Sequence, residues 1–220
     1  VAQAQKSNRL SIGPIVSYLF WHLLDKNTQS KKSLVDPGHA QRTLLWNLAN
    51  NNWDQQLLDW FAIPAQLLPQ CQYHNSHFGD LQLGDRKIPF TASARDQGAS
   101  LFARGLPQAD CIYINIGTGA FIQRISETLQ APDGILVSPL WLPEKPLPQN
   151  PTAKKYYAWE ATVNGAAAAI SFMQTQTGLA ITPAEMDEAL QLNPQHACYL
   201  LNAVGGLSAP YWRTDLQSQF

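Results

Sequence analysis

The sequence predicts an α/β protein, because helical and strand-like patterns alternate along its 220 residues. An apolar, aromatic-rich run over residues 12–24 predicts a buried helix that opens after Gly13-Pro14. Short apolar segments on either side of Gly84-Asp85 predict a pair of strands joined by a turn. Alternating residues over 110–125 predict a second hairpin. Strands of this kind, placed between helical segments, indicate a mixed fold.

The remaining elements are predicted from breaks and periodicity along the chain. In the first half of the chain they are a turn at Asp36-Pro37-Gly38, a strand or helix over 41–48, a helix opened by Trp53-Asp54 and closed by Ile63-Pro64, a helical turn over 65–69, and a helical run from Gly98 to Ala103. In the second half they are a proline-rich loop over 140–151, a strand over 156–159, helices over 164–173 and 183–192, and a loop over 205–212. Gly105-Leu106-Pro107 breaks one helix before a new hairpin. We therefore predict two domains, residues 1–107 and 108–220.

Composition restricts the class of protein. Apolar residues make up 45% of the chain and charged residues 14%, which favours a packed core over disorder. The net charge of −1 argues against nucleic acid as a partner. No apolar run is long enough to span a membrane, and no secretion signal is apparent at the N-terminus. Three widely spaced cysteines (Cys71, Cys111 and Cys198) indicate reduced thiols in a cytoplasmic protein.

Asp96-Gln97 is the first candidate for chemistry, because it lies at a predicted strand-to-helix junction. A carboxylate in that position can accept a proton from a bound hydroxyl, and Gln97 can hydrogen-bond a second hydroxyl of a polyol. The alternative interpretation is that Asp96 only caps the helix, with its oxygen accepting backbone N–H groups. The residues alone leave both interpretations open.

Gly117-Thr118-Gly119 is the second candidate. Two glycines let the backbone approach a phosphate closely, the threonine adds a hydroxyl, and a tight turn presents the N–H groups together. An ordinary hairpin turn, with glycines in positive φ, is the alternative. The spacing matches neither a Walker A loop nor a Rossmann fingerprint.

The histidines and tryptophans give weaker signals. His74, His77 and Asp80 have a spacing at which a metal site is conceivable, but their polar context indicates solvated loop residues, and we predict no metal ligands. Most of the seven tryptophans lie in apolar runs and are predicted to be core residues. Trp21 and Trp212 are the two that we can place at the edge of a cleft, Trp21 as a substrate contact.

Six sequence blocks, in their order, resemble the FGGY family of carbohydrate kinases over roughly residues 10–215. The blocks are Arg42-Thr43, the Asp54 to Pro69 segment with its Ile63-Pro64 and Leu68-Pro69 pairs, Asp96-Gln97-Gly98-Ala99-Ser100-Leu101-Phe102, Asn115-Ile116-Gly117-Thr118-Gly119, Glu160 to Ala166, and Gly206-Leu207-Ser208-Ala209-Pro210-Tyr211-Trp212. The last block is very similar to the family's Gly-Leu-x-Ala-Pro-Tyr-Trp. Six such matches in the right order are hard to obtain by chance.

The resemblance implies an actin-like fold with two RNase H-like domains and a cleft between them. It implies phosphorylation of a sugar or polyol hydroxyl by ATP with Mg²⁺, in a cytoplasmic enzyme for which a homodimer is a reasonable expectation. In this scheme Asp96 is the general base, Gln97 contacts the substrate, and Gly117, Thr118 and Gly119 hold the ATP phosphates. Because phosphoryl transfer mainly needs positioning and charge neutralisation, one carboxylate with Mg²⁺ and backbone donors suffices.

Two departures from the family pattern qualify these expectations. The family's N-terminal Asp-x-Gly-Thr loop and its glycine-rich adenine loop are missing, so the chain is expected to be a central fragment that alone neither binds ATP tightly nor turns over. Val35 to Thr43 also differs from the glycerol-kinase pattern, which leaves glycerol, a pentulose or another polyol as the substrate. The alternatives are a non-catalytic sugar-binding relative and an actin-fold ATPase that acts on a protein client.

Overall fold

The computed structural model describes residues 10–25, 33–146, 148, 151–192 and 200–218. The chain divides into two compact units. Unit 1 comprises residues 1–109, 125–130 and 137–158, and unit 2 comprises residues 110–124, 131–136 and 159–220. Cys198 lies outside the described residues. In the described ranges, no helix has both the length and the apolar character that a membrane span requires.

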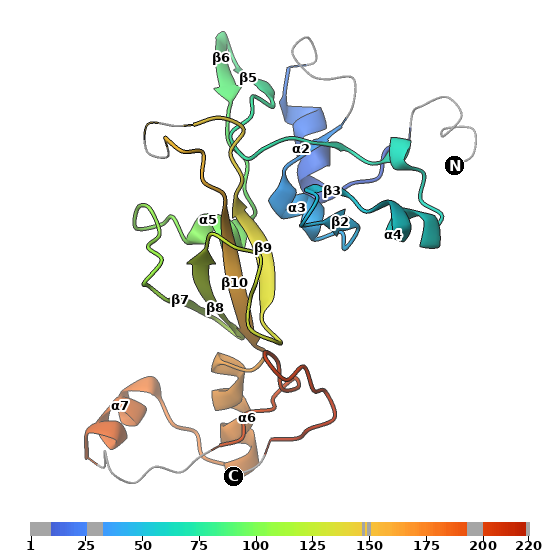
Figure 1. Cartoon of the computed structure of the whole chain (residues 1–220). Helices are drawn as coiled ribbons and strands as arrows, with labels where there is room; N and C mark the ends of the chain where they lie inside the picture. Colours follow the sequence, from blue (N-terminus) through green and yellow to red (C-terminus); the bar gives the residue numbers. More distant parts are fainter. Residues whose placement is uncertain (1–9, 26–32, 147, 149–150, 193–199, 219–220) are drawn as a thin grey trace. The chain divides into compact units, whose positions relative to one another are not determined.

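Unit 1 begins with short helices and paired strands (Figure 1). In chain order these are α2 (Ile15–Leu23), β1 (Leu34–Val35), α3 (Pro37–Gln41), β2 (Trp46–Asn47), β3 (Asn52–Trp53), α4 (Gln55–Trp60), the 3₁₀ turn η1 (Ala65–Leu67), β4 (Gln70–Cys71), β5 (Gly79–Leu83), β6 (Arg86–Phe90) and α5 (Asp96–Ser100). β1 pairs in parallel with β4, and β2 pairs antiparallel with β3. Of residues 41–48, predicted to form a strand or a helix, only Trp46–Asn47 form a strand, and β4 is equally short.

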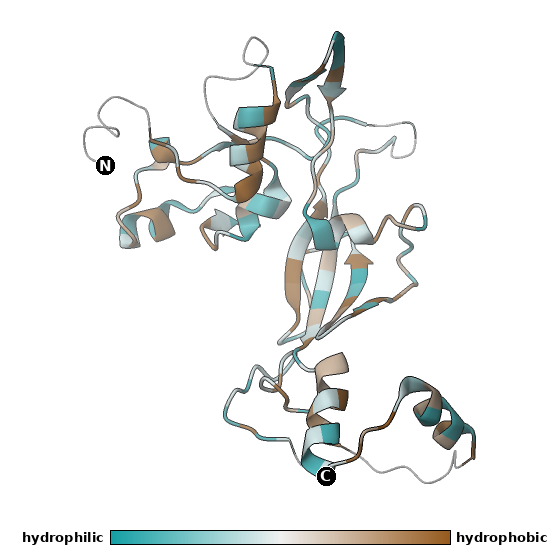
Figure 2. Ribbon diagram, turned by 180° about the vertical axis from the view of Figure 1, so that it is seen from behind, coloured by the Kyte–Doolittle hydropathy of each residue, from teal (hydrophilic) through white to brown (hydrophobic). Residues whose placement is uncertain are grey.

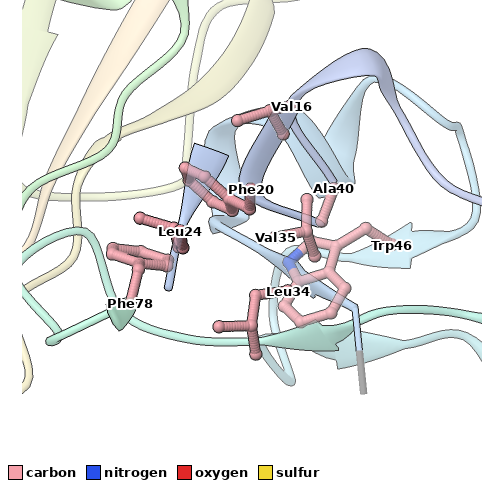
Figure 3. Close-up of a cluster of buried hydrophobic side chains, with 8 residues drawn as sticks. All are labelled: Val16, Phe20, Leu24, Leu34, Val35, Ala40, Trp46 and Phe78. Carbon is pink, nitrogen blue, oxygen red and sulfur yellow. The ribbon is translucent and has the colours of Figure 1, made fainter. Parts of the chain in front are cut away.

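The core of unit 1 forms around α2. Val16 and Phe20 lie four residues apart, on one face of the helix, and both are buried. They pack with Leu24, Leu34, Val35, Ala40, Trp46 and Phe78 (Figure 3). Figure 2 shows hydrophobic colour along most of α2. The helix was expected to be buried, but Trp21 and other large apolar residues of its second face are exposed.

The turn predicted at Asp36-Pro37-Gly38 is instead the start of a helix. Asp36 is the N-cap of α3, and its side chain accepts the backbone N–H of His39 at 3.1 Å. Pro37 occupies the first helical position, where its fixed φ is compatible with the helix and its missing N–H costs nothing. The prediction was wrong because Asp-Pro-Gly is compatible both with a turn and with a helix start.

Other local predictions for unit 1 are confirmed. Asp54 caps α4 by accepting the N–H of Leu57 at 3.2 Å, and η1 forms the helical turn expected over 65–69. β5 and β6 pair antiparallel from Gly79↔Phe90 to Leu83↔Arg86. Gly84, with φ of +58°, supplies the left-handed residue that the tight turn requires.

A four-stranded sheet has the order β7-β8-β10-β9. Its strands are β7 (Tyr113–Ile116), β8 (Ala120–Ser126), β9 (Leu136–Trp141) and β10 (Tyr156–Val163). The hairpin predicted over 110–125 is confirmed, with β7 and β8 paired antiparallel. β10 is longer than predicted. β9 was not predicted, because residues 126–139 were assigned no element and the proline-rich loop was predicted to begin at residue 140.

Unit 2 also contains α6 (Ala167–Thr177) and α7 (Pro183–Leu192). α6 ends at Gly178, whose φ of +69° provides a left-handed C-cap. Both helices confirm the predicted ones, although α6 starts three residues later than expected. The loop predicted over 205–212 is present, and an isolated bridge between Leu207 and Arg213 closes its end.

Candidate functional site

Asp96 is the first residue of α5, at the end of the segment that follows β6. The N-cap position belongs to Arg95, which makes no side-chain capping hydrogen bond. The Asp96 side chain is exposed, and its Oδ1 accepts the backbone N–H of Gln97 at 2.7 Å. One carboxylate oxygen therefore has a fixed local partner. The carboxylate is presented to solvent, where a bound hydroxyl can reach it.

Gln97, the neighbouring candidate, is half-buried. Its Oε1 atom is shielded from solvent and accepts no hydrogen bond in the part of the chain that the structure describes. A shielded amide oxygen without a donor is unfavourable, so the residue has unused capacity for a ligand hydroxyl. Trp21 lies on α2 with 47% of its surface exposed, and no hydrogen bond joins it to either Asp96 or Gln97 within the described ranges.

Residues of β9 contact the start of α5. Arg95 Nη2 donates to Ser138 Oγ at 3.3 Å. The backbone of Gly98 lies close to Leu140, since a Cβ atom at position 98 would be 3.6 Å from Leu140 Cδ1. The strand missed by sequence reasoning is thus the one that supports the candidate base.

A buried carboxylate lies beside the segment that precedes Asp96. Asp36 is fully buried, and its Oδ2 accepts a hydrogen bond from Ser93 Oγ at 2.6 Å. The ring Nδ1 of His39 lies 2.6 Å from the same oxygen. Because an ionised carboxylate only accepts hydrogen bonds, His39 Nδ1 must carry a proton in this arrangement. Asp36, His39, His74 and Ser93 are called the Asp36 cluster below.

His74 completes the Asp36 cluster. The ring is fully buried, and its Nδ1 accepts the N–H of Leu142 at 3.0 Å. An accepting Nδ1 carries no proton, so the neutral ring must hold its proton on Nε2. This Nε2 lies 3.9 Å from Asp36 Oδ1, too far for a hydrogen bond, and it has no other partner among the described residues. His74 was predicted to be a solvated loop residue, and that prediction is wrong.

The ionisation of the Asp36 cluster follows from this geometry. Burial alone raises the pKa of Asp36, but the hydrogen bond and charge of His39, the charge of His74 and the Ser93 hydroxyl together lower it to about 2. Burial lowers the pKa of His74 to about 4, against the opposing effect of the Asp36 charge. At neutral pH the cluster therefore contains one buried carboxylate and one neutral buried imidazole.

His77 is an exposed loop residue, as predicted, whereas Asp80 lies in β5 and is half-buried, so the prediction of a solvated loop residue is wrong for Asp80. The His77 side chain is 53% exposed, and its Nε2 lies 2.8 Å from Asp80 Oδ1. Within the described ranges, no group of three or more histidine, cysteine, aspartate or glutamate side chains has the arrangement of a metal site. His74 and His77, three residues apart in sequence, thus occupy different environments.

Gly117, Thr118 and Gly119 form the turn between β7 and β8 in unit 2. The N–H of Gly117 donates to the carbonyl of Gly119 at 2.8 Å. The carbonyl of Thr118 accepts from the N–H groups of Ala166 and Ala168, and the carbonyl of Gly117 accepts from that of Ala167. The turn is therefore fixed by the first amides of α6, and its carbonyl groups point toward that helix.

Two amides of the turn have no hydrogen-bond acceptor among the described residues. The N–H groups of Thr118 and Gly119 donate to no protein acceptor in the described parts of the chain, and Thr118 is exposed. Adjacent backbone N–H groups in a tight turn suit the oxygens of a phosphate. Gly119 also cannot carry a side chain, since a Cβ atom there would lie 2.8 Å from the carbonyl oxygen of Val163.

The second glycine-rich segment of unit 2 is fixed by side chains. Trp212 Nε1 donates to the carbonyl of Gly134 at 2.7 Å. Asn164 Nδ2 donates to the carbonyl of Gly205 at 2.7 Å. Trp212, placed at a cleft edge from the sequence, is 46% exposed and anchors this segment through its indole nitrogen.

Sequence reasoning missed the Asp36 cluster. Asp36 was assigned to a turn, His74 to a solvated loop, and Ser93 was not considered. The available signal was Asp36 followed by Pro37, which is a helix-cap pattern. No local pattern indicated the burial of His74, because the Leu142 amide that its ring binds is 68 residues away.

Comparison with known proteins identifies the first part of the chain. Residues 2–103 match the N-terminal domain of the FGGY family of carbohydrate kinases. The glycerol kinase of Rippkaea orientalis is 30% identical over 213 residues, which cover 94% of this chain and 40% of that protein. Glycerol kinase 1 of Thermotoga maritima is 30% identical over 223 residues, which cover 99% of this chain and 43% of that protein.

Solved structures show the same fold. The glycerol kinase of Plasmodium falciparum, determined with ADP, superposes with a TM-score of 0.78 at 22% identity, over 99% of this chain and 42% of that one. A ligand-bound xylulose kinase from Lactobacillus acidophilus superposes with a TM-score of 0.71 at 21% identity, over 94% of this chain and 41% of that one.

The chain spans about two fifths of the length of the curated relatives that it matches. The match nevertheless extends over nearly all of its own residues. Its fold is the actin-like ATPase fold of these kinases. The chain is thus similar to the FGGY family of carbohydrate kinases, by that family's N-terminal domain over residues 2–103 and by glycerol kinases over nearly all of its length.

Proposed function

We propose that this chain is part of a kinase that transfers the γ-phosphoryl group of ATP to a hydroxyl of a sugar or polyol. The observation that carries this proposal is the exposed Asp96 carboxylate at the start of α5, beside the shielded and unpartnered Gln97 Oε1. Glycerol and xylulose kinases among the relatives and neighbours support a small polyhydroxylated acceptor. The setting expected for an ATP-dependent enzyme of this kind is the cytoplasm.

Asp96 acts as the general base in this proposal. Its free carboxylate oxygen accepts the proton of the substrate hydroxyl as the hydroxyl oxygen forms its bond to the γ-phosphorus and the bond to ADP breaks. Gln97 Oε1 accepts a hydrogen bond from a second hydroxyl and so orients the acceptor. As a further part of the proposal, Trp21 contacts the same substrate through the apolar surface of its ring.

The turn over Gly117, Thr118 and Gly119 holds the phosphates in this proposal. Its two unpaired amides and the Thr118 hydroxyl supply donors for phosphate oxygens. When bound, ATP supplies the phosphoryl group, and Mg²⁺ neutralises the charge on its oxygens. The residues present fit phosphate, because the adjacent N–H groups of Thr118 and Gly119 and the Thr118 hydroxyl supply several donors in one turn.

Sugar-dependent release of ADP by the complete gene product tests the function. We expect one compound among glycerol, pentuloses, pentitols and hexuloses to stimulate ADP release with MgATP at least tenfold over the rate without sugar. Coupled spectrophotometry measures the rate, and thermal denaturation measures binding. A sugar that raises the melting temperature without stimulating release would instead favour a non-catalytic sugar-binding protein. ATP hydrolysis that no sugar stimulates would favour an ATPase with a protein client.

Two alanine substitutions test the proposed phosphate-binding role of the turn over Gly117, Thr118 and Gly119. In Gly119→Ala the new Cβ would lie 2.8 Å from the carbonyl oxygen of Val163 and 3.0 Å from that of Asn164. We expect a lower melting temperature and a KM for ATP raised roughly tenfold, equivalent to about 1.4 kcal/mol of binding. In Gly117→Ala the nearest atom would be 3.9 Å away, so the melting temperature should not change.

Comparison of Gly119→Ala with Gly117→Ala separates an effect on stability from an effect on ATP binding. If Gly117→Ala raises the KM for ATP but leaves the melting temperature unchanged, the new methyl group hinders the phosphate from approaching the backbone. Equal losses of stability in both variants would contradict the steric account. An unchanged KM for ATP in both would show that this turn does not hold the nucleotide.

A further inference from the structure

The Asp36 cluster is a buried charged group that the proposed function does not use. It lies in unit 1, as do Asp96 and Gln97. A buried carboxylate is costly unless it is paired and hydrogen-bonded, so its retention requires compensating partners. Asp36 has such partners in the backbone N–H and ring of His39 and in the hydroxyl of Ser93.

Ser93 is the member of the cluster that is nearest to the candidate base in sequence. Its hydroxyl donates to Asp36 Oδ2 at 2.6 Å, and its backbone N–H donates to the carbonyl of His74 at 3.0 Å. Ser93 is itself buried, with 8% of its surface exposed. The segment that enters α5 is thus fixed by a side-chain contact and a backbone contact, only three residues before Asp96.

His74 connects the same point to the strand that supports α5. Its backbone N–H donates to the carbonyl of Leu142 at 3.1 Å, and its ring accepts the Leu142 N–H at 3.0 Å. Leu142 directly follows β9, the strand whose Ser138 binds Arg95. Both contacts of the Asp96 segment, Ser93 and Arg95, are therefore tied to a single buried framework.

Close packing leaves this framework little freedom. A Cβ atom on Gly38 would lie 3.1 Å from Asp36 Oδ1 and 3.4 Å from His74 Nε2. Only glycine leaves the gap between the carboxylate and the ring undisturbed. A hydrogen bond to a charged group is stronger than a neutral one, so Ser93 is held more firmly than an ordinary loop residue.

We propose that Ser93, held by Asp36 and by the backbone of His74, is a positioning residue that sets the place of Asp96 for phosphoryl transfer. This inference rests on the proposed kinase function. Ser93 does not touch the substrate. It acts by restricting the segment that carries the base, and displacements of about 1 Å at a catalytic group can cost about a hundredfold in rate.

Ser93→Ala in the complete gene product tests this inference. The variant loses the hydroxyl that binds Asp36 but keeps the backbone contact with His74. We expect kcat to fall about tenfold while the KM values for sugar and ATP stay within about twofold, because the base is displaced and the binding groups are not. Ser93→Thr, which keeps the hydroxyl, is expected to recover most of the lost kcat.

Ser17→Ala is the matched control. Ser17 is also buried, on α2, but its Oγ has no hydrogen-bond partner in the described residues. Its replacement should leave kcat unchanged. A fall in kcat of similar size in Ser17→Ala and Ser93→Ala would show a general effect of buried serine loss and overturn the inference, as would a Ser93→Ala variant with the kcat of the wild type.

Amide hydrogen exchange gives a second measurement that does not depend on turnover. Ser93→Ala should exchange faster over residues 91–97 and at the wild-type rate in α4. Unchanged exchange over 91–97 would overturn the inference. If the wild-type protein itself releases no ADP with any sugar, the proposed function fails, and the exchange data still decide whether the Ser93 hydroxyl holds the segment.

Discussion

Asp96→Asn in the complete gene product is expected to lower kcat about a thousandfold, within the range by which general acid–base groups contribute. The amide has nearly the size of the carboxylate but cannot accept the proton of the substrate hydroxyl. Its oxygen can still accept the Gln97 N–H, the one hydrogen bond that Asp96 makes locally, so the start of α5 should keep its geometry. The affinity for sugar should therefore stay within about twofold of the wild type.

Steady-state ADP release gives kcat, and titration calorimetry with the sugar gives the affinity. Asp85→Asn serves as the matched control, because Asp85 is an exposed carboxylate in the β5–β6 turn of the same unit. It should retain wild-type kcat. A kcat for Asp96→Asn within tenfold of the wild type would remove Asp96 from the role of base.

Asp36→Ala is expected to cause the largest loss of stability, about 3–5 kcal/mol, as measured when one partner of a buried ionic group is removed. The substitution leaves the Ser93 hydroxyl and the His39 ring without their acceptor in a closed environment. It also deletes the N-cap of α3. Urea unfolding followed by tryptophan fluorescence measures the change.

Asp54→Ala provides the comparison. Asp54 caps α4 in the same way that Asp36 caps α3, but it is a more exposed residue, bound by the Asn47 amide rather than by a buried histidine and serine. We expect a clearly smaller loss from Asp54→Ala. Equal losses in the two variants would mean that Asp36 matters only as a helix cap, without a contribution from the cluster.

Elements specified by neighbouring residues could be predicted from the sequence. The β5–β6 hairpin follows from alternation around Gly84, and α4 follows from the Asp54 cap ahead of Leu57 and Leu58. The β7–β8 turn was located by its two glycines. In each case the decisive interactions connect residues close together in the chain, so the pattern carries the information.

The Asp36 cluster could not be predicted, because its contacts join distant segments. Ser93 lies 57 residues from Asp36, and Leu142 lies 68 residues from His74. A histidine in a polar stretch looks solvated unless the strand that lies beside it is known, and that strand, β9, was not predicted. Asp96 was proposed as the base from a local motif, whereas the framework around it became visible only in the tertiary structure.

The hydrogen bonds between the Gly117–Gly119 turn and the start of α6 affect the order in which the chain folds during its synthesis. The carbonyls of Gly117 and Thr118 are bound by amides of residues 166–168, which leave the ribosome only after β9 and β10 have been made. Contacts of such sequence separation form late and slow folding. During translation the nascent hairpin therefore passes through a period in which its turn lacks its final restraints, until α6 has emerged.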